Sequence, residues 1–228
     1  MTDVEVYRDL RKLFGPARDQ GARPTCLPFA ASDAHAALRD SWSPLSCEYA
    51  FFHAQRRSAR PPTCGATLPS ILEVLQHDGQ PMEVDWPYLA QIPSDLASWR
   101  PPSNIGSLFR RAGSIGSSKL DAVIYLLEQG RPVILLMTLS PSFFLAGLDG
   151  IVDPALNEAP EPSQRHAVIA AGHGKVKGQR VILVRNSWGA NWAMNGHAWL
   201  TERFLSPRLF NAATLMEELY VSSRPAAA

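Results

Sequence analysis

Four polar residues of this sequence could together attack a carbonyl group: Cys26, His166, Asn186 and Gln20. Cys26 opens a segment whose apolar residues recur at helical spacing. The start of a helix favours a thiolate, because the peptide dipoles and first N–H groups stabilise negative charge there. A thiolate that performs acyl transfer also needs a histidine to hold and donate a proton. Among the six histidines, we single out His166, which stands at the start of a predicted strand where it could face such a helix end.

Two further residues would complete the chemistry. Asn186 ends the strand predicted after that of His166, and antiparallel pairing would bring its side-chain oxygen to the imidazole N–H. Attack on a carbonyl also creates an oxyanion, which needs hydrogen-bond donors. The N–H of Cys26 is one expected donor. The side-chain amide of Gln20 is the other, since residues 21–25 can fold it back over the helix start.

Each of these residues alone has an ordinary structural interpretation. Single cysteines are usually buried and inert, lone histidines are more often core residues, and an asparagine at a strand end is usually a turn residue. Gln20 could be a simple loop residue. The order of all four along the chain favours catalysis. Asp33 and His35, two positions apart on a predicted helix, are expected to be a solvated pair and not metal ligands.

The elements that must position these residues change character along the chain. Apolar spacing and end signals predict four helices. The first begins at Cys26 and the second at Ser43-Pro44. The third carries Leu68 and stops at Asp78-Gly79, and the fourth runs from Leu120 to Gly130. Short β-branched or apolar segments then predict strands at 133–139, 167–171, 180–184, 197–201 and 219–223. An α+β fold is therefore expected, with a helical lobe at about 18–115, a β lobe at about 116–223 and a disordered tail at 224–228. A seam between two lobes is a natural place for a cleft.

Composition excludes several functional classes. A chain of 228 residues can bury a sizeable core, and a net charge of +1 gives no electrostatic case for nucleic acid or membrane binding. No apolar run reaches the roughly 20 residues of a membrane helix. The N-terminus has no signal-peptide core, so a cytoplasmic protein is expected, with signal-less export as the alternative. The irregularly spaced Cys26, Cys47 and Cys64 predict neither a disulfide framework nor a zinc site, and no metal or cofactor is expected.

Several motifs resemble those of the papain-like cysteine peptidases, peptidase family C1, in particular bacterial members. They are Asp9-Leu10-Arg11, Gln20-Gly21 with four residues before Cys26, Gly65 to Pro69 followed by Trp86-Pro87-Tyr88, His166-Ala167-Val168 through Gly172-His173-Gly174, and Asn186-Ser187-Trp188-Gly189 followed by Trp192 and Gly196. The resemblance covers about residues 9–203. It implies one papain-like domain, with the active-site cleft between an N-terminal helical lobe and an antiparallel, barrel-like β lobe.

The same resemblance implies an endopeptidase. Cys26 would be the nucleophile, His166 the acid and base, Asn186 the residue that orients the imidazole, and Gln20 an oxyanion donor. Trp188 would shield the His–Asn hydrogen bond from water. The implied partner is a protein or peptide substrate, and a protein inhibitor or regulatory partner is left open. No pro-region of the usual length precedes the domain, so inhibition by a cleaved prosegment is not expected.

Departures from the family pattern concern substrate binding. The residues expected to line the substrate site are Arg23, Pro24, Thr25, Gly65, Ala66, Thr67, Pro69, Arg165 and Trp188. Pro24 replaces a family glycine and, with Arg23, suggests a narrower or acid-accepting pocket. Arg23 also replaces a cysteine that forms a disulfide in the family, which fits a reducing compartment. The acidic loop at 153–164 is expected to be a solvated surface loop, or to rim the cleft and disfavour acidic substrates.

Two other functions stay open at this point. The acyl-enzyme could be passed to an amine or a thiol, which would make the chain a ligase or an acyltransferase. Alternatively, Pro24 and Leu27, which depart from the family motif around the nucleophile, would suit a non-catalytic binding module on a peptidase fold. The module requires Cys26 to be unreactive.

Overall fold

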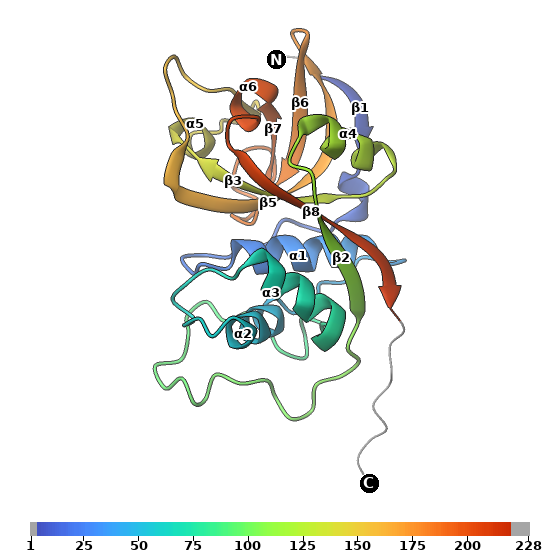
Figure 1. The fold of residues 1–228 in the computed structure, drawn as a ribbon, viewed down its shortest axis with the longest axis vertical. Coiled ribbons are helices and arrows are strands. Elements are labelled where there is room, and N and C mark those ends of the chain that lie inside the picture. Colours follow the sequence, from blue (N-terminus) through green and yellow to red (C-terminus); the bar gives the residue numbers. More distant parts are fainter. Residues whose placement is uncertain (1–3, 220–228) are drawn as a thin grey trace. The chain divides into compact units, whose positions relative to one another are not determined.

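The computed structural model describes residues 4–219. Within them the chain forms two compact units (Figure 1). The first contains residues 4–19 and 115–214, and the second contains residues 20–114 and 215–219. The chain therefore passes between the units three times. The lobes expected from the sequence were two consecutive segments, whereas the second unit also includes residues 215–219.

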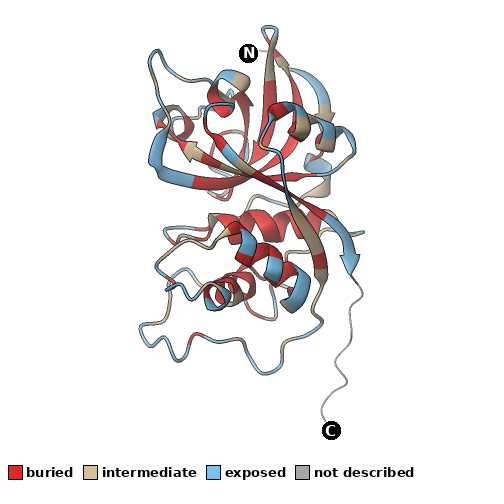
Figure 2. Ribbon diagram, in the orientation of Figure 1, coloured by how far each residue is buried: buried red, intermediate tan, exposed pale blue. Residues whose placement is uncertain are grey.

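A sheet forms the centre of the first unit. Its strands lie in the order β8 (Leu209–Leu219), β3 (Val133–Leu139), β5 (Glu161–Val176), β6 (Gln179–Arg185), β7 (His197–Thr201) and β4 (Ile151–Val152). β1 (Glu5–Asp9) pairs with β5 off this path. The pairings are antiparallel from β8 to β7, and β4 pairs with β7 in parallel. Alternating apolar residues of β3, β5, β6 and β7 form one buried core (Figure 2).

Short helices pack on this sheet. They are η1 (Arg11–Leu13), α4 (Leu120–Glu128), α5 (Pro141–Phe144) and α6 (Glu202–Leu205). Two glycines of β5 allow β1 to approach closely: a Cβ atom would lie 2.4 Å from the carbonyl oxygen of Arg8 at Gly172 and 2.3 Å from that of Glu5 at Gly174. Any side chain at either position would displace β1 from the strand that carries His166.

Helices form the second unit: α1 (Cys26–Ala37), α2 (Cys47–Arg57), α3 (Leu68–Glu73) and a π turn, η2 (Val74–Asp78), that continues α3. α1 begins at Cys26 as predicted, with Pro28 in its first turn, where a missing N–H is tolerated. Every residue of α1 after Cys26 is buried, as the uniform colour of this helix in Figure 2 shows. β2 (Arg110–Gly116) neighbours β8 in the strand order, and both strands run across the division between the units.

The structure corrects two expectations about the elements and their surface. α2 begins at Cys47 and not at Ser43-Pro44, because the Ser46 hydroxyl caps it by accepting the N–H of Tyr49 at 3.0 Å. Of the strand expected at 219–223, the structure describes only Leu219, which ends β8 (Leu209–Leu219); the rest lies outside the described residues, as does the expected tail at 224–228.

The second correction concerns Asp33 and His35, which are 4% and 0% exposed and are therefore not a solvated pair. His35 donates from Nδ1 to the side-chain oxygen of Gln80 at 3.0 Å, and burial lowers the pKa of His35 to about 3. Across residues 4–219, no group of three or more His, Cys, Asp and Glu side chains is placed to hold a metal ion. In the same range, no helix has the length and apolar character needed to span a membrane.

Candidate active site

His166 and Asn186 lie together in the first unit. The β5–β6 register pairs Ile169 with Arg185, so the residue after β6 comes close to the strand position of His166. The Nε2 atom of His166 and the Oδ1 atom of Asn186 are 2.7 Å apart. The hydrogen bond expected from the sequence is therefore present.

The contacts of Asn186 assign the donor and acceptor. Its Oδ1 atom also accepts the backbone N–H of Ser187 at 2.8 Å, which identifies this atom as the carbonyl oxygen of the amide. Because an amide oxygen only accepts, Nε2 of His166 must carry the hydrogen. The other ring nitrogen, Nδ1, is then the basic nitrogen of the neutral imidazole.

Aromatic rings surround this hydrogen bond. The ring centroid of Trp188 lies 4.8 Å from that of His166, and the ring centroid of the buried Phe143 lies 5.8 Å from it in a T-shaped arrangement. Phe144 stacks on the outer side of Trp188 at 5.5 Å. His166 and Asn186 are only 6% and 3% exposed, so little water reaches the bond between them.

Burial also sets the charge of the imidazole. It lowers the pKa of His166 to about 4, although the hydrogen bond with Asn186 acts in the opposite direction. In the absence of a nearby negative charge, this side chain is therefore neutral at pH 7. It can accept a proton from an acid, and the imidazolium needs a counter-charge to persist.

Most residues of the loop at 153–164 are exposed, as expected for a solvated surface loop, but Glu158 ties the loop to the aromatic wall, which we define as Phe143, Phe144 and Trp188. The Glu158 side chain is 8% exposed and accepts the N–H of Ser142 at 3.0 Å and the N–H of Ala155 at 2.9 Å. It also binds the Ser142 hydroxyl. Burial alone would raise the pKa of Glu158, but these hydrogen bonds together with one from Ser140 lower it to about 2. An ionised Glu158 thus ties the loop to α5, the helix that carries Phe143.

Cys26 lies in the second unit as the first residue of α1, directly after the N-cap residue Thr25. It is half-exposed, and none of the three cysteines forms a disulfide. α1 has 12 residues, which is long enough for a developed dipole with its positive end at Cys26. The helix start thus offers a thiolate the electrostatic environment that the sequence suggested.

Residues 20–25 precede α1, and we call them the oxyanion loop after the role that the sequence predicts for Gln20. The side-chain amide of Gln20 donates to the carbonyl oxygen of Arg23 at 2.9 Å, and the N–H of Thr25 donates to the same oxygen at 2.8 Å. Gly21 adopts φ = +57°, which lets the chain turn sharply here. The amide of Gln20 therefore points back to Arg23, three residues before Cys26, and its role as an oxyanion donor stays a prediction.

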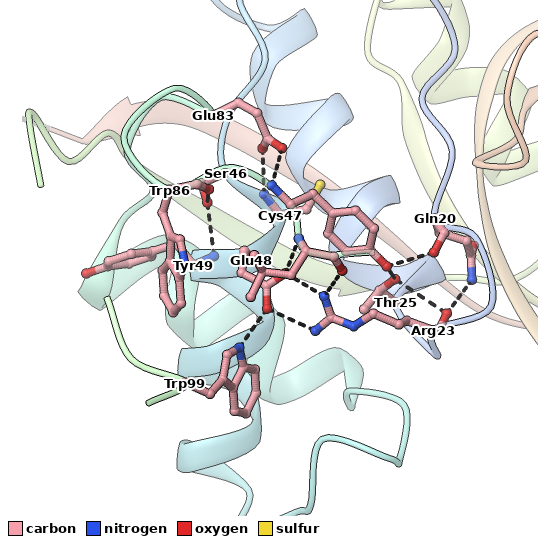
Figure 3. Close-up of polar contacts among 12 residues, drawn as sticks. Gln20, Arg23, Thr25, Ser46, Cys47, Glu48, Tyr49, Glu83, Trp86 and Trp99 are labelled. Atoms are coloured by element: carbon pink, nitrogen blue, oxygen red, sulfur yellow. Dashed lines mark hydrogen bonds and ion pairs between the residues drawn. The ribbon is translucent and has the colours of Figure 1, made fainter. Parts of the chain in front are cut away.

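Arg23 differs from its expected role. Its guanidinium is 6% exposed and forms two contacts with the Glu48 carboxylate, at 2.6 and 2.9 Å (Figure 3). Glu48 is fully buried and also accepts the indole N–H of Trp99 at 2.7 Å. A guanidinium already neutralised in this way is a poor receptor for an acidic substrate, so the geometry argues against an acid-accepting pocket at Arg23.

The other expected substrate residues of the second unit lie on one connected stretch. A Cβ on Gly65 would lie 3.7 Å from the carbonyl oxygen of Pro24, so Gly65 lies beside the oxyanion loop. Ala66 packs against the aromatic cluster that includes Trp99. Thr67 caps α3 by accepting the N–H of Ser70 at 3.3 Å, and Pro69 lies in the first turn of that helix.

Two expected substrate residues belong to the first unit. Trp188 is half-buried in the aromatic wall beside His166. Arg165 is exposed on β5, with its guanidinium 5.6 Å from the ring centroid of Phe210.

Sequence inspection missed the supporting role of four residues, of which Tyr88 was noted only within the Trp86-Pro87-Tyr88 motif. Glu48 and Tyr88 bind the oxyanion loop, and Phe143 and Phe144 flank Trp188. Glu48 interrupts an otherwise apolar helix face, which was the one available signal of a buried carboxylate.

Comparison with known proteins identifies the family. The family model described as "Papain family cysteine protease" matches residues 8–206. Pro-cathepsin H of Bos taurus is 25% identical over 193 residues, covering 82% of this chain and 56% of the relative. Pro-cathepsin H of Mus musculus is 24% identical over 201 residues, covering 86% and 59%. The chain thus spans little more than half the length of these curated relatives.

Solved structures agree in fold. Xylellain, a cysteine protease from Xylella fastidiosa, superposes with a TM-score of 0.69 at 19% identity, over 91% of this chain and 84% of the other. The digestive procathepsin L 3 of Tenebrio molitor larval midgut gives 0.68 at 18% identity, over 94% and 70%. The α+β papain-like fold predicted from the sequence is thereby confirmed. With the family model matched from residue 8 to residue 206, this chain belongs to the papain family of cysteine proteases.

Proposed function

We propose that this chain is a thiol peptidase that cleaves peptide bonds of proteins or peptides through an acyl-enzyme on Cys26. The observation that carries the proposal is the shielded hydrogen bond from Nε2 of His166 to Asn186, which leaves Nδ1 as a base. Cys26 at the start of α1 supplies the nucleophile. Membership of the family supports assigning these two residues to one reaction.

The reaction has two halves. Nδ1 of His166 takes the proton of the Cys26 thiol, and the thiolate sulfur bonds to the substrate carbonyl carbon. The resulting oxyanion accepts hydrogen bonds from the N–H of Cys26 and the side-chain amide of Gln20. The imidazolium then gives its proton to the amide nitrogen as the C–N bond breaks, so that the amine leaves and a thioester remains.

Water completes the cycle. Nδ1 of His166 takes a proton from water while the oxygen bonds to the thioester carbon. The C–S bond then breaks, releasing the carboxylic acid, and the proton returns to the Cys26 sulfur. Throughout, Asn186 keeps the imidazole in the tautomer and orientation that both halves require.

The chain connects Asp19 of the first unit directly to Gln20 of the second. Asp19 forms a β-bridge with Trp188, and the N–H of Gly189 donates to the carbonyl of Arg18 at 3.0 Å. Gln20 is the next residue of the chain. The oxyanion loop therefore begins one peptide bond after the segment that pairs with the residues following Asn186.

Brief alkylation with limiting iodoacetamide at about pH 5.5 tests the proposal directly. Ordinary thiols, with a pKa near ~8.5, react very slowly there. We expect a single adduct, mapped to Cys26, that is lost in His166→Ala and kept in His77→Ala, a change at an exposed histidine. Half-exposed Cys64 is an internal control for ordinary thiol reactivity.

Two further observations complete this test. Cys26→Ala should retain the circular dichroism of the wild type and lose hydrolysis of denatured casein. Absence of an adduct in folded, reduced protein would reject the peptidase and favour a non-catalytic binding module. Product masses with and without an added amine distinguish hydrolysis from acyl transfer.

A further inference from the structure

We propose that Tyr88 is a positioning residue for the oxyanion loop, so that its hydroxyl group sets the geometry of the oxyanion donors without touching the substrate. This inference rests on the proposed peptidase function, and it assigns a role to a residue outside the nucleophile, base and donor set. Three groups of contacts lead to it.

The hydroxyl of Tyr88 joins both ends of the loop. It donates to the carbonyl oxygen of Gln20 at 2.7 Å, and it lies 2.8 Å from Oγ1 of Thr25. Since the only phenolic hydrogen goes to Gln20, Thr25 donates to the Tyr88 oxygen. Burial raises the pKa of Tyr88, although the hydrogen bond from Thr25 acts in the opposite direction, so the hydroxyl stays protonated and able to donate. One oxygen atom thus connects Gln20 with the residue that precedes the nucleophile.

Arg23 holds the middle of the loop to the same support. Its guanidinium contacts the Glu48 carboxylate, donates to the carbonyl oxygen of Leu89 at 2.5 Å and lies 4.9 Å from the ring centroid of Tyr88. The Tyr88 hydroxyl therefore binds the two ends of the loop, and the ion pair of Arg23 with Glu48 holds its centre.

Tyr88 is itself fixed to the first turn of α2. Its backbone N–H donates to one oxygen of Glu83 at 2.8 Å, while the other Glu83 oxygen accepts the N–H of Cys47 at 3.2 Å. The next N–H, of Leu89, donates to Glu48 at 3.0 Å. Figure 3 shows Glu83, Glu48 and the loop residues converging on the start of α2. The position of the loop is thus set by α2 and not by a helix or strand of its own.

Such a support matters because a donor must be placed accurately. Catalytic groups have to be held within roughly 0.5 Å of the productive geometry. Removing one oxyanion donor typically costs ~100-fold or more in kcat, so displacing the loop that carries Gln20 should cost less. We expect kcat of Tyr88→Phe to fall about 10-fold. KM should stay within about twofold, because the oxyanion exists only after attack.

The test compares hydrolysis with alkylation in Tyr88→Phe, which keeps the ring that packs on Arg23 and Phe29. Kinetics are measured on a fluorogenic peptide amide, and alkylation of Cys26 is followed with iodoacetamide. Alkylation displaces iodide and builds no oxyanion, so its rate should change less than about twofold. Inhibition by a peptide aldehyde, which forms an oxyanion on the enzyme, should weaken by the same factor as kcat. Tyr125→Phe, at an exposed tyrosine of α4, is the matched control.

Each outcome decides the inference. Wild-type kcat in Tyr88→Phe would overturn it, and so would parallel losses of hydrolysis and alkylation, which indicate a general structural defect. Thr25→Val, which removes the other hydroxyl of the pair, should reproduce the selective loss, and wild-type behaviour there would equally contradict the role. An unreactive Cys26 in the wild type would instead reject the peptidase itself, so the two failures are distinguishable.

Discussion

His166 and Cys26 are positioned by different physical means. His166 lies on a long strand whose backbone hydrogen bonds are made by β3 and β6, and its ring is fixed by aromatic neighbours. The residues before Cys26 have no regular structure, and a buried ion pair with a set of hydrogen bonds holds them instead.

A strand and a loop satisfy their backbone hydrogen-bonding groups in different ways. In a sheet, neighbouring strands satisfy the polar backbone groups, so side chains near His166 can be apolar and exclude water. A loop with buried residues leaves their carbonyl and N–H groups largely to side chains. The Tyr88 hydroxyl binds the carbonyl oxygen of Gln20, and the Gln20 side-chain amide binds that of Arg23. The buried charge of Glu48 is tolerated only because both of its oxygens have partners. Polar side chains thus hold the loop in position, whereas strand pairing and apolar packing hold the strand that carries His166.

The largest effect should follow from breaking the ion pair. Glu48→Ala leaves Arg23 buried without its carboxylate, and we expect the free energy of unfolding to fall by ~3–5 kcal/mol. Urea denaturation followed by circular dichroism measures this change. Glu73→Ala, which removes a largely exposed partner of Arg57, should cost less than ~1 kcal/mol. Similar losses in the two variants would mean that burial does not distinguish the two glutamates.

A somewhat smaller effect concerns the protonation of His166, which should differ between the wild type and Cys26→Ala. Burial lowers its pKa to about 4, but a Cys26 thiolate would supply the counter-charge for the imidazolium. In Cys26→Ala the imidazole should stay neutral down to about pH 5, whereas in the wild type it should be protonated at pH 6. That change corresponds to ~3 kcal/mol, and NMR titration of the ring protons measures it. Titration at the same pH in both proteins would rule out the thiolate–imidazolium pair.

The lowered pKa of His166 also makes the free energy of unfolding depend on pH. In Cys26→Ala the folded pKa of His166 lies below the ~6.5 of an unfolded histidine, so unfolding takes up a proton between these values. Its contribution to the free energy of unfolding is complete above pH 6.5 and is lost as the pH falls toward 4. Comparison with Cys26→Ala/His166→Gln isolates this contribution.

The smallest effects concern the aromatic wall. Trp188→Ala should admit water to the hydrogen bond between His166 and Asn186 and lower kcat about 10-fold, or ~1.4 kcal/mol. Phe144→Ala removes only the ring stacked on the outer side of Trp188 and should lower kcat about twofold or less. Steady-state kinetics on one peptide substrate measures both variants. A greater loss in Phe144→Ala would show that substrate contact, and not shielding, governs this wall.

Local patterns made part of this structure predictable. The start of α1 at Cys26 and the hydrogen bond between His166 and Asn186 followed from helical spacing and from two consecutive antiparallel strands. Ser43-Pro44 and Ser46 offer competing signals for the start of α2, and local sequence does not decide between them. In the structure Ser46 caps the helix, and the preceding Leu45 forms a bridge with the distant Met82.

Contacts between distant residues were beyond local patterns. The partner of Arg23 lies 25 positions away, and the carbonyl group bound by the Tyr88 hydroxyl lies 68 positions away. Neither distance has a periodic signature. A charged Arg23 therefore indicated a substrate contact from the sequence, while in the fold it is neutralised by Glu48.

The burial of the Arg23–Glu48 pair also determines how the oxyanion loop should respond to ionic strength. Mobile ions weaken interactions between exposed charges, such as that of Arg203 with Asp153, but they act much less on a pair withdrawn from solvent. The loop should therefore keep its geometry from dilute buffer to molar salt. A disulfide would share that indifference to salt but would yield to a reductant, whereas this ionic tether is insensitive to both.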